Sequence, residues 1–288
     1  MTRRLALACL LLLACGAQPV VAASCTVSAT SINFGNYSGS VLTMDGTITV
    51  KCTKGDAYDV ALNAGTTTGA TVSNRSMTHS GVNLSYGLYS NASYTSNWGN
   101  STATGWVTGV GTGANQTLTV YGQIPANQYA TPETSAYSDT ITVTVSGPDF
   151  TTKTTTLTVE AMVVASCTIS ATPLAFGTYS GAVNNSTSTI SVTCTNSTAF
   201  NVGLNAGTAS GATVTNRSMT GPGSALLGYS LYSNSGRSAN WGNTVGTNTV
   251  AGTGSGTLQS LPVYGQIPAG QYPTPGNYSD TITATITY

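Results

Sequence analysis

The chain has 288 residues, of which 40% are hydrophobic and only 6% are charged, and its formal net charge is zero. This length suffices for two domains of ordinary size, each with its own core. No basic patch is present, which argues against nucleic acid as a partner. The hydrophobic residues alternate with polar ones as in strands, so the composition favours folded β structure over a disordered chain.

Residues 1–23 have the pattern of a secretory signal peptide. Arg3 and Arg4 form the positive n-region, and Leu5–Ala14 is an apolar stretch too short to span a bilayer. No later run is apolar enough for a membrane span. We therefore expect an exported protein whose mature chain has a small net negative charge, because both leader arginines are removed.

Two processing routes fit this leader. The small residues 21–23 predict cleavage after Ala23, so that the mature chain begins at Ser24. Alternatively, residues 12–15 resemble a bacterial lipobox with Cys15 as the lipidated residue.

The mature chain keeps four cysteines in two equally spaced pairs, Cys25 with Cys52 and Cys167 with Cys194. In an exported protein this spacing indicates one disulfide per pair. Each bridge would contribute about 3–4 kcal/mol in the chain-entropy model. A metal site is the rival interpretation, but it is disfavoured because the chain has no CxxC pair and one histidine.

Residues 25–145 and 167–286 repeat one another with a nearly constant offset. A period this long indicates two copies of one domain and excludes a solenoid of small units. The segments that both copies share are Cys-Thr-[Val/Ile]-Ser-Ala-Thr, Phe-Gly, Leu-Asn-Ala-Gly, Asn-Arg-Ser-Met, Leu-Tyr-Ser-Asn, Asn-Trp-Gly-Asn, Tyr-Gly-Gln-Ile-Pro and Tyr-Ser-Asp-Thr-Ile-Thr.

Each copy has the pattern of a β-sandwich. Residues 47–52 and 189–194 alternate with period 2, as do residues 140–145 and 281–286. Threonine is β-branched and suits the solvent face of such strands. Clusters of Gly, Asn and Pro separate the strands, and no stretch has a helical period. The sequence therefore predicts two all-β sandwiches of immunoglobulin-like size.

Three further residue types recur in both copies, and we interpret all three as structural. The arginines are expected to be anchored to loop carbonyls or to a carboxylate, the aspartates to accept from turn amides, and the tryptophans to pack in the core or against turns. These residues are Arg75, Arg217, Asp139, Asp280, Trp98 and Trp241.

The sequence does not favour an enzyme. His79 is the one histidine, it has no counterpart in the second copy, and we interpret it as a surface-loop residue. The acidic residues are scattered singly, without an acid/base pair or a metal-ligand cluster. No glycine-rich phosphate motif is present. We predict no catalytic residues, no cofactor and no metal.

The shared segments resemble the spore coat protein U domain family, and the resemblance covers the mature chain twice. It implies either a secreted coat protein or a subunit of an archaic (Csu-type) chaperone–usher pilus. Pilin domains of that kind are immunoglobulin-like sandwiches that lack their last strand. The N-terminal extension of a neighbouring subunit supplies that strand by β-augmentation.

Residues 151–165 occur in the first copy alone and follow a turn. Their apolar face is expected to fill the groove of the first copy, and the strand is expected to pair antiparallel with residues 140–145. The first domain would then span residues 24–165 and close itself. The residues on the apolar face are Leu157, Val159, Ala161 and Val163.

The second domain, residues 166–288, has no such strand, so its groove is expected to be open. An open groove with unpaired edges must be covered. The resemblance implies a periplasmic chaperone first, then a donor strand of the next subunit during assembly at an outer-membrane usher. The predicted groove edge consists of Ile282, Ala284, Ile286 and Tyr288.

Ahead of Cys25 the expected mature chain is too short to donate a strand. A subunit that receives a strand but donates none fits the tip of a pilus, periplasmic in transit and then on the cell surface, with a role in attachment and biofilm formation. The first alternative is a secreted or lipid-anchored spore-coat or matrix protein that does not polymerise. The second is a free carbohydrate-binding protein.

Adhesive residues are expected where the first copy departs from the second. Residues 104–113 form a Gly/Thr-rich stretch that we predict to be a flexible loop, with Trp106, Val107 and Val110 inserting into irregularities of a surface. The alternative is that Trp106 packs on its own sandwich.

Overall fold

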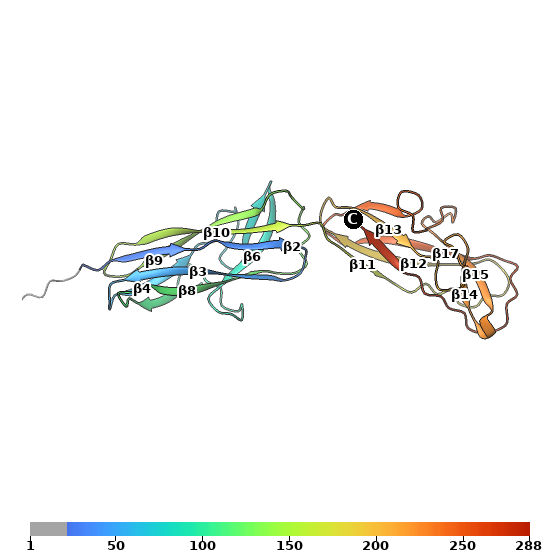
Figure 1. Ribbon diagram of the computed structural model, residues 1–288, viewed down its shortest axis with the longest axis horizontal. Helices are drawn as coiled ribbons and strands as arrows, with labels where there is room; N and C mark the ends of the chain where they lie inside the picture. Colours follow the sequence, from blue (N-terminus) through green and yellow to red (C-terminus); the bar gives the residue numbers. More distant parts are fainter. Residues whose placement is uncertain (1–21) are drawn as a thin grey trace, which may run out of the picture.

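The computed structural model describes residues 22–288, which form two β-sandwich domains placed end to end (Figure 1). The hydrophobic core of the first domain ends at Val163, and Cys167 packs against the core of the second. The prediction of an all-β chain with two tandem sandwiches is confirmed. Most of the predicted leader, including Cys15, lies outside the described residues. Among residues 22–288, no helix has the length and apolarity that a membrane span requires.

The first domain is built from two packed layers. One layer has the strand order β1-β3-β8-β6, and the other has β5-β9-β10-β2, with β4 paired to β9 and β7 paired to β4. Strand β6 joins the layers because it pairs with both β8 and β5. The strands are β1 (Cys25–Ala29), β2 (Ile32–Tyr37), β3 (Leu42–Cys52), β4 (Ala57–Leu62), β5 (Arg75–His79), β6 (Val82–Tyr89), β7 (Val107–Val110), β8 (Gln116–Ile124), β9 (Tyr137–Ser146) and β10 (Lys153–Val163).

Strand β9 shows why the alternating sequence forms this layer. Ile141, Val143 and Val145 are fully buried, while the threonines between them lie on the outer face, partly exposed. A pleated strand sends successive side chains to opposite faces, so this alternation places every apolar residue in the core.

Strand β10 lies between β9 and β2. It pairs antiparallel with β9, with Leu157 opposite Ile141, and parallel with β2, with Val159 opposite Ile32. The register with β2 shifts between Glu160 and Met162. The parallel pairing with β2 was not anticipated from the sequence. The four residues of its inner face are all buried, namely Leu157, Val159, Ala161 and Val163.

The second domain repeats this plan with fewer paired strands. Its sheets have the orders β11-β12-β17-β15-β14 and β16-β13-β18. The elements are β11 (Cys167–Ala171), β12 (Asn184–Cys194), β13 (Ala199–Leu204), β14 (Arg217–Thr220), the short 3-10 helix η1 (Pro222–Ser224), β15 (Leu226–Tyr232), β16 (Val250–Thr253), β17 (Gln259–Ile267) and β18 (Ala284–Thr287).

Two segments of the second domain differ from their counterparts in the first. Residues 174–179 match β2 in sequence but form no strand, and the counterpart of β9 is reduced to β18. The strand predicted at 281–286 therefore begins only at Ala284. The physical reason is that β10 has no equivalent within the described second domain, so neither segment gains the backbone hydrogen bonds that β10 gives to β9 and β2.

Each domain has one disulfide at the same end. Cys25 and Cys52 are joined between β1 and β3, and Cys167 and Cys194 are joined between β11 and β12. In both cases the two cysteines are direct partners in the strand register. The bridge of the second domain lies at the end that faces the first domain, because Asn196, two residues after Cys194, bonds to Tyr129 of the first domain.

Candidate strand-binding groove

A cleft of about 470 Å³ runs along the second domain between residues 172–176 and residues 278–284, the segments that match the strands on either side of β10. Leu174 and Phe176 line one side, and Tyr278 and Ile282 line the other. The floor consists of core side chains from the strands beneath, namely Ile190, Leu204, Met219, Tyr229, Leu231 and Val263. The cleft is therefore an opening into the hydrophobic core.

The cleft corresponds to the place that β10 occupies in the first domain. By the sequence repeat, Leu174 matches Ile32 of β2, and Ile282 matches Ile141 of β9. Ile32 and Ile141 lie on either side of β10 and are both 0% exposed, whereas Leu174 and Ile282 remain half-buried. The same walls thus exist in both domains, and only the strand between them differs.

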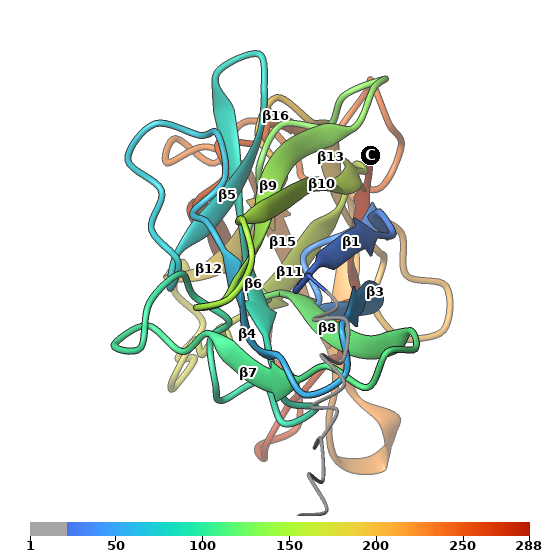
Figure 2. The same ribbon diagram turned by 90° about the vertical axis from the view of Figure 1, so that its left-hand side faces the viewer.

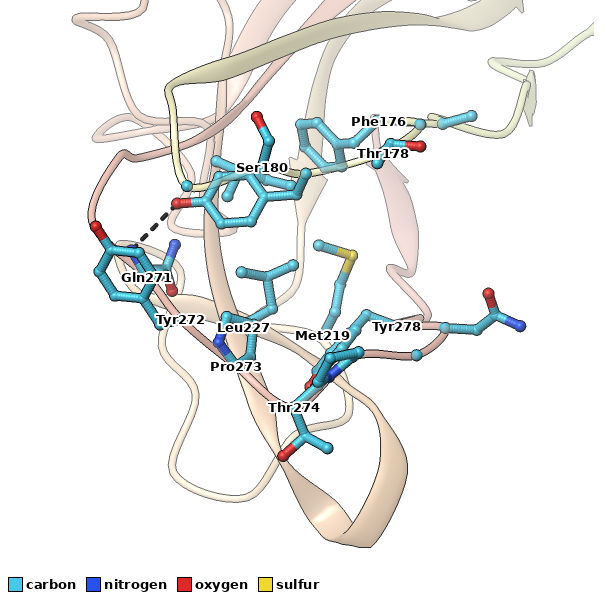
Figure 3. Close-up of a pocket in the computed structure, with 18 of the residues that line it drawn as sticks. Phe176, Thr178, Ser180, Met219, Leu227, Gln271, Tyr272, Pro273, Thr274 and Tyr278 are labelled. Carbon is cyan, nitrogen blue, oxygen red and sulfur yellow. Dashed lines mark hydrogen bonds between the residues drawn. The ribbon is translucent and has the colours of Figure 1, made fainter.

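A wider cavity of about 920 Å³ continues from the cleft and is lined in addition by residues 177–181 and 271–277. Phe176 and Met219 face each other across it, and Tyr272 lies at its rim (Figure 3). Tyr179 matches Tyr37, which pairs with Val163 at the end of β10. A strand placed like β10 would therefore leave the second domain through this cavity.

The predicted groove edge divides into two parts. Ile282 and Ala284 line the cleft, while Ile286 packs against the core from β18, opposite Val202. Tyr288 is 57% exposed and lies beyond the end of β18. Within the described residues, β18 pairs on one side only, with β13, so its other side offers backbone donors and acceptors to an added strand.

The opposite wall was missed in the sequence analysis. Leu174, Phe176 and Tyr179 form it, and none of them belongs to the predicted edge. Their match to Ile32, Phe34 and Tyr37 was visible in the repeat, but it carries this meaning only once β10 is known to lie against β2.

A carboxylate lies in the wall of the cleft. Asp280 accepts hydrogen bonds from the backbone N–H and the hydroxyl of Thr208, both at 2.8 Å, and from the hydroxyl of Tyr229 at 2.7 Å. Partial burial acts to raise the pKa of Asp280, but these hydrogen bonds and one from the Thr281 N–H outweigh it and hold the pKa below its ordinary value. Burial and the contact with Asp280 raise the pKa of Tyr229, which stays a proton donor.

A buried arginine occupies the same place in each domain. Arg217 is 0% exposed and donates to the carbonyl oxygens of Leu204, Asn205, Val214 and Trp241. Burial lowers its pKa. Backbone carbonyls, and not a carboxylate, are thus its direct partners.

Arg75 has the same surroundings in the first domain. Its guanidinium donates to the carbonyl oxygens of Leu62, Asn63, Val72 and Trp98. Burial lowers the pKa of Arg75 to about 10. Both arginines therefore join three loops to the core of their domain and are not available to a ligand.

His79 is not a loop residue, contrary to the sequence-based interpretation. It ends β5, its Nε2 lies 3.6 Å from Oε2 of Glu133, and its ring packs 5.7 Å from that of Tyr137. The pairing of β5 with β6 extends to His79, which explains the difference. In residues 22–288, no group of three His, Cys, Asp or Glu side chains is placed to hold a metal.

The predicted adhesive loop is also different in the structure. Residues 107–110 form β7, which pairs with β4 and is therefore not a flexible loop. Val107 packs against the core and Trp106 is half-buried, so Val110, at 56% exposure, is the apolar side chain that this segment presents to solvent. Strand β7 lies toward the end of the first domain that faces the viewer in Figure 2.

Comparison with known proteins agrees with this architecture. The family model described as Spore Coat Protein U domain matches residues 12–144 and 153–285, so the chain belongs to this family. It is similar to Protein U of Myxococcus xanthus, with 40% identity over 128 residues that cover 40% of this chain and 71% of that protein.

A solved structure has a similar fold. It is a chain from the pre-assembly complex of the chaperone CsuC with the tip adhesion subunit CsuE, from the archaic chaperone-usher Csu pili of Acinetobacter baumannii. The match has a TM-score of 0.54 with 15% identity, and it covers 92% of this chain and 100% of the other. At this identity the likeness concerns the fold.

Proposed function

We propose that this protein is an adhesive structural subunit at the tip of a secreted bacterial pilus, assembled by donor-strand complementation in the groove of its second domain. The observation that carries the proposal is the cleft between residues 172–176 and 278–284, which repeats the site that β10 fills in the first domain. Membership of the family and a fold shared with a chaperone-usher complex are consistent with it.

The first domain shows what the groove accepts. Strand β10 supplies alternating apolar side chains to the core and backbone hydrogen bonds to both neighbouring strands. Burying each of the large apolar side chains contributes about 1.5–3 kcal/mol. A strand of this pattern from another subunit would complete the second domain in the same way, and a periplasmic chaperone would cover the groove before assembly at the usher.

A peptide with the sequence of residues 151–165 tests the groove. We expect that it raises the thermal unfolding temperature of the second domain in the purified full-length chain, because a ligand that binds only the folded state stabilises it. The control peptide carries Leu157→Asp and Val159→Asp, which place charges against the apolar walls. An unchanged unfolding temperature with the unmodified peptide would contradict the proposal.

The adhesive role is assigned to the end of the first domain away from the second. Export through the leader, passage through the periplasm and display on the cell surface follow from a pilus location. Val110 is exposed there, Val107 packs against the core, and Trp106 is half-buried. Val110→Ser should reduce attachment to surfaces and biofilm formation while pili remain intact, with Thr253→Ser in the second domain as the matched control. Attachment equal to that of the unchanged chain would remove Val110 from the contact surface.

The second candidate function is a spore-coat or matrix protein that does not polymerise, including one lipidated at Cys15. The description of the matching family as Spore Coat Protein U domain favours this candidate. The peptide experiment distinguishes the two, because a coat protein that works as a monomer has no need of a groove that binds a strand. Both candidates are structural, and neither is an enzyme.

A further inference from the structure

The two domains are held together by hydrogen bonds as well as by the linker. The backbone N–H of Asn196 donates to the carbonyl oxygen of Tyr129 at 3.0 Å, and its side-chain Nδ2 donates to Oγ1 of Thr131 at 2.9 Å. Asn196 lies in the turn that follows Cys194 of the second domain. Tyr129 and Thr131 lie in a loop of the first domain between β8 and β9.

A glycine makes this close approach feasible. Gly256 has φ +71° and lies beside Tyr129, such that a Cβ at this position would be 3.0 Å from the Tyr129 carbonyl oxygen. Within the first domain, the N–H of Val164 donates to the carbonyl of Tyr37, which fixes the place where the chain leaves toward the second domain. The disulfide end of the second domain thus has a shape and a set of donors that fit the end of the first.

We call the loop between β8 and β9, which accepts the hydrogen bonds of Asn196, the receiving loop. The second domain has a matching loop at its end away from the first domain. Tyr272 and Thr274 match Tyr129 and Thr131 in the repeat. The loops have the same internal bonds: the hydroxyls of Tyr137 and Tyr278 donate to the Thr131 and Thr274 carbonyls, respectively, both at 2.7 Å.

The glutamine that precedes each tyrosine confirms this match. The N–H groups of Gln128 and Gln271 both donate to a tyrosine hydroxyl at 3.2 Å. The Tyr179 hydroxyl is the acceptor in the second domain, where the bond crosses the rim of the wider cavity (Figure 3). The two receiving loops therefore present their outward carbonyl and hydroxyl groups in the same arrangement.

At the second loop these groups have no partner among residues 22–288. The Tyr272 carbonyl and the Thr274 hydroxyl accept no hydrogen bond there, and the Tyr272 side chain is 89% exposed, whereas Tyr129 is half-buried. The loop also forms part of the cavity through which an added strand would leave the groove. A domain attached to that strand would emerge directly above it.

The outer end of the first domain lacks the complementary donor. Lys54 occupies the place of Asn196 in the turn after Cys52, and Gly113 occupies that of Gly256. A lysine keeps the backbone N–H, but it replaces the neutral side-chain amide that donates to Thr131 with a long, flexible ammonium group and would put a charge in the contact. Each domain therefore has a receiving loop, but of the two domains the second alone has the donor Asn196, and this donor is already bonded to the first domain.

We propose that the loop containing Tyr272 and Thr274 is a docking surface for the disulfide end of the next subunit's domain, which repeats between subunits the junction seen within this chain. The partner is a domain of the same family with an asparagine two residues after its second cysteine. The proposal rests on the proposed function, because a next subunit is present only if the groove receives its strand.

A three-domain chain tests the docking. Tyr288 matches Gly147, so a second copy of residues 148–288 appended after Tyr288 supplies both a β10 strand and a following domain. Thr274→Cys with Asn196→Cys in the appended copy should cross-link to the same yield as Thr131→Cys with Asn196→Cys in the normal chain, as measured by mass spectrometry. Loss of the cross-link at the new junction, with the reference pair still cross-linked, overturns the docking proposal.

Binding of the appended strand in the groove is measured separately in the same molecule. A rise in the unfolding temperature of the central domain shows that the appended strand is bound, whatever the cross-link does. Strand binding without the cross-link therefore overturns the docking alone, and loss of both overturns the proposed function as well. A second variant, Asn196→Lys in the normal chain, should loosen the two domains and increase the interdomain motion measured by NMR relaxation; unchanged motion also counts against the docking role of Asn196.

Discussion

The two domains are built from one repeated sequence, yet their cores are not equally closed. Both have the buried arginine with four carbonyl partners, the aspartate bonded to a tyrosine hydroxyl, and a disulfide at the same end. They differ in one strand, β10. Beside β10, Tyr137 is 0% exposed, whereas the matching Tyr278 lines a cavity. One strand therefore decides whether the sandwich is finished.

The difference also shows which features of the fold do not depend on that strand. The counterparts of β3, β8 and β6 pair as well in the second domain as in the first. The two segments that correspond to β2 and β9 lack the hydrogen bonds that β10 makes in the first domain, although β18 still pairs with β13. The open groove is thus a local feature of a domain that is otherwise formed, consistent with a site kept for an added strand.

Disruption of the closing strand, β10, should have the largest effect on stability. Leu157→Asp puts a charge among fully buried side chains and should destabilise the first domain by about 4 kcal/mol or more. Rapid proteolysis of the first domain would be the measured result. The control Thr156→Asp lies on the exposed face of β10 and should change stability by no more than about 0.5 kcal/mol. Equal effects of the two variants would refute the burial of this face.

Loss of a disulfide should have the second largest effect on stability. Cys25→Ser with Cys52→Ser should cost about 2–5 kcal/mol, and Cys167→Ser with Cys194→Ser a similar amount, because each bridge closes a loop of the same length. The unfolding temperature of each domain, followed by calorimetry, measures the effect. A large cost in one domain alone would show that the two bridges are not equivalent.

Loss of the buried arginine should have a smaller effect that differs between domains. Arg75→Met leaves buried carbonyls without a donor and should cost about 1–3 kcal/mol. Arg217→Met should cost less, because the open groove lets water reach its surroundings. Chemical denaturation of both variants measures the difference, and a greater cost for Arg217→Met would contradict it.

The smallest effect on stability concerns its dependence on pH through Asp280. The pKa of Asp280 is lower in the folded protein than its ordinary value of 3.8. The ionised carboxylate therefore adds stability that is fully present above pH 3.8 and is lost as the pH falls through the lowered pKa. Asp280→Asn should remove this part of the acid dependence of the second domain. Unfolding temperatures of both chains at neutral and acidic pH test this, and an unchanged acid dependence would contradict it.

Part of the site was predictable from residues alone. The alternation around Leu157 and Val159 indicated a strand with a buried face, and residues 167–288 contain no segment that matches it. Alternation is a local property, so it predicts a buried face without knowledge of the partner. The loop predicted around Val110 failed for the related reason that the pairing of β7 with β4 involves residues far away in the sequence.

The sequence by itself determined the all-β class, the duplication, the cysteine pairs and the place of the extra strand, because periodicity and spacing are properties of the chain. The tertiary structure alone decided that β10 lies between β9 and β2, that residues 174–179 form the second wall of the groove, and that Asn196 reaches Tyr129 across the domain junction. These contacts join segments distant in the chain, and their selection depends on how the two sheets pack and where the linker ends.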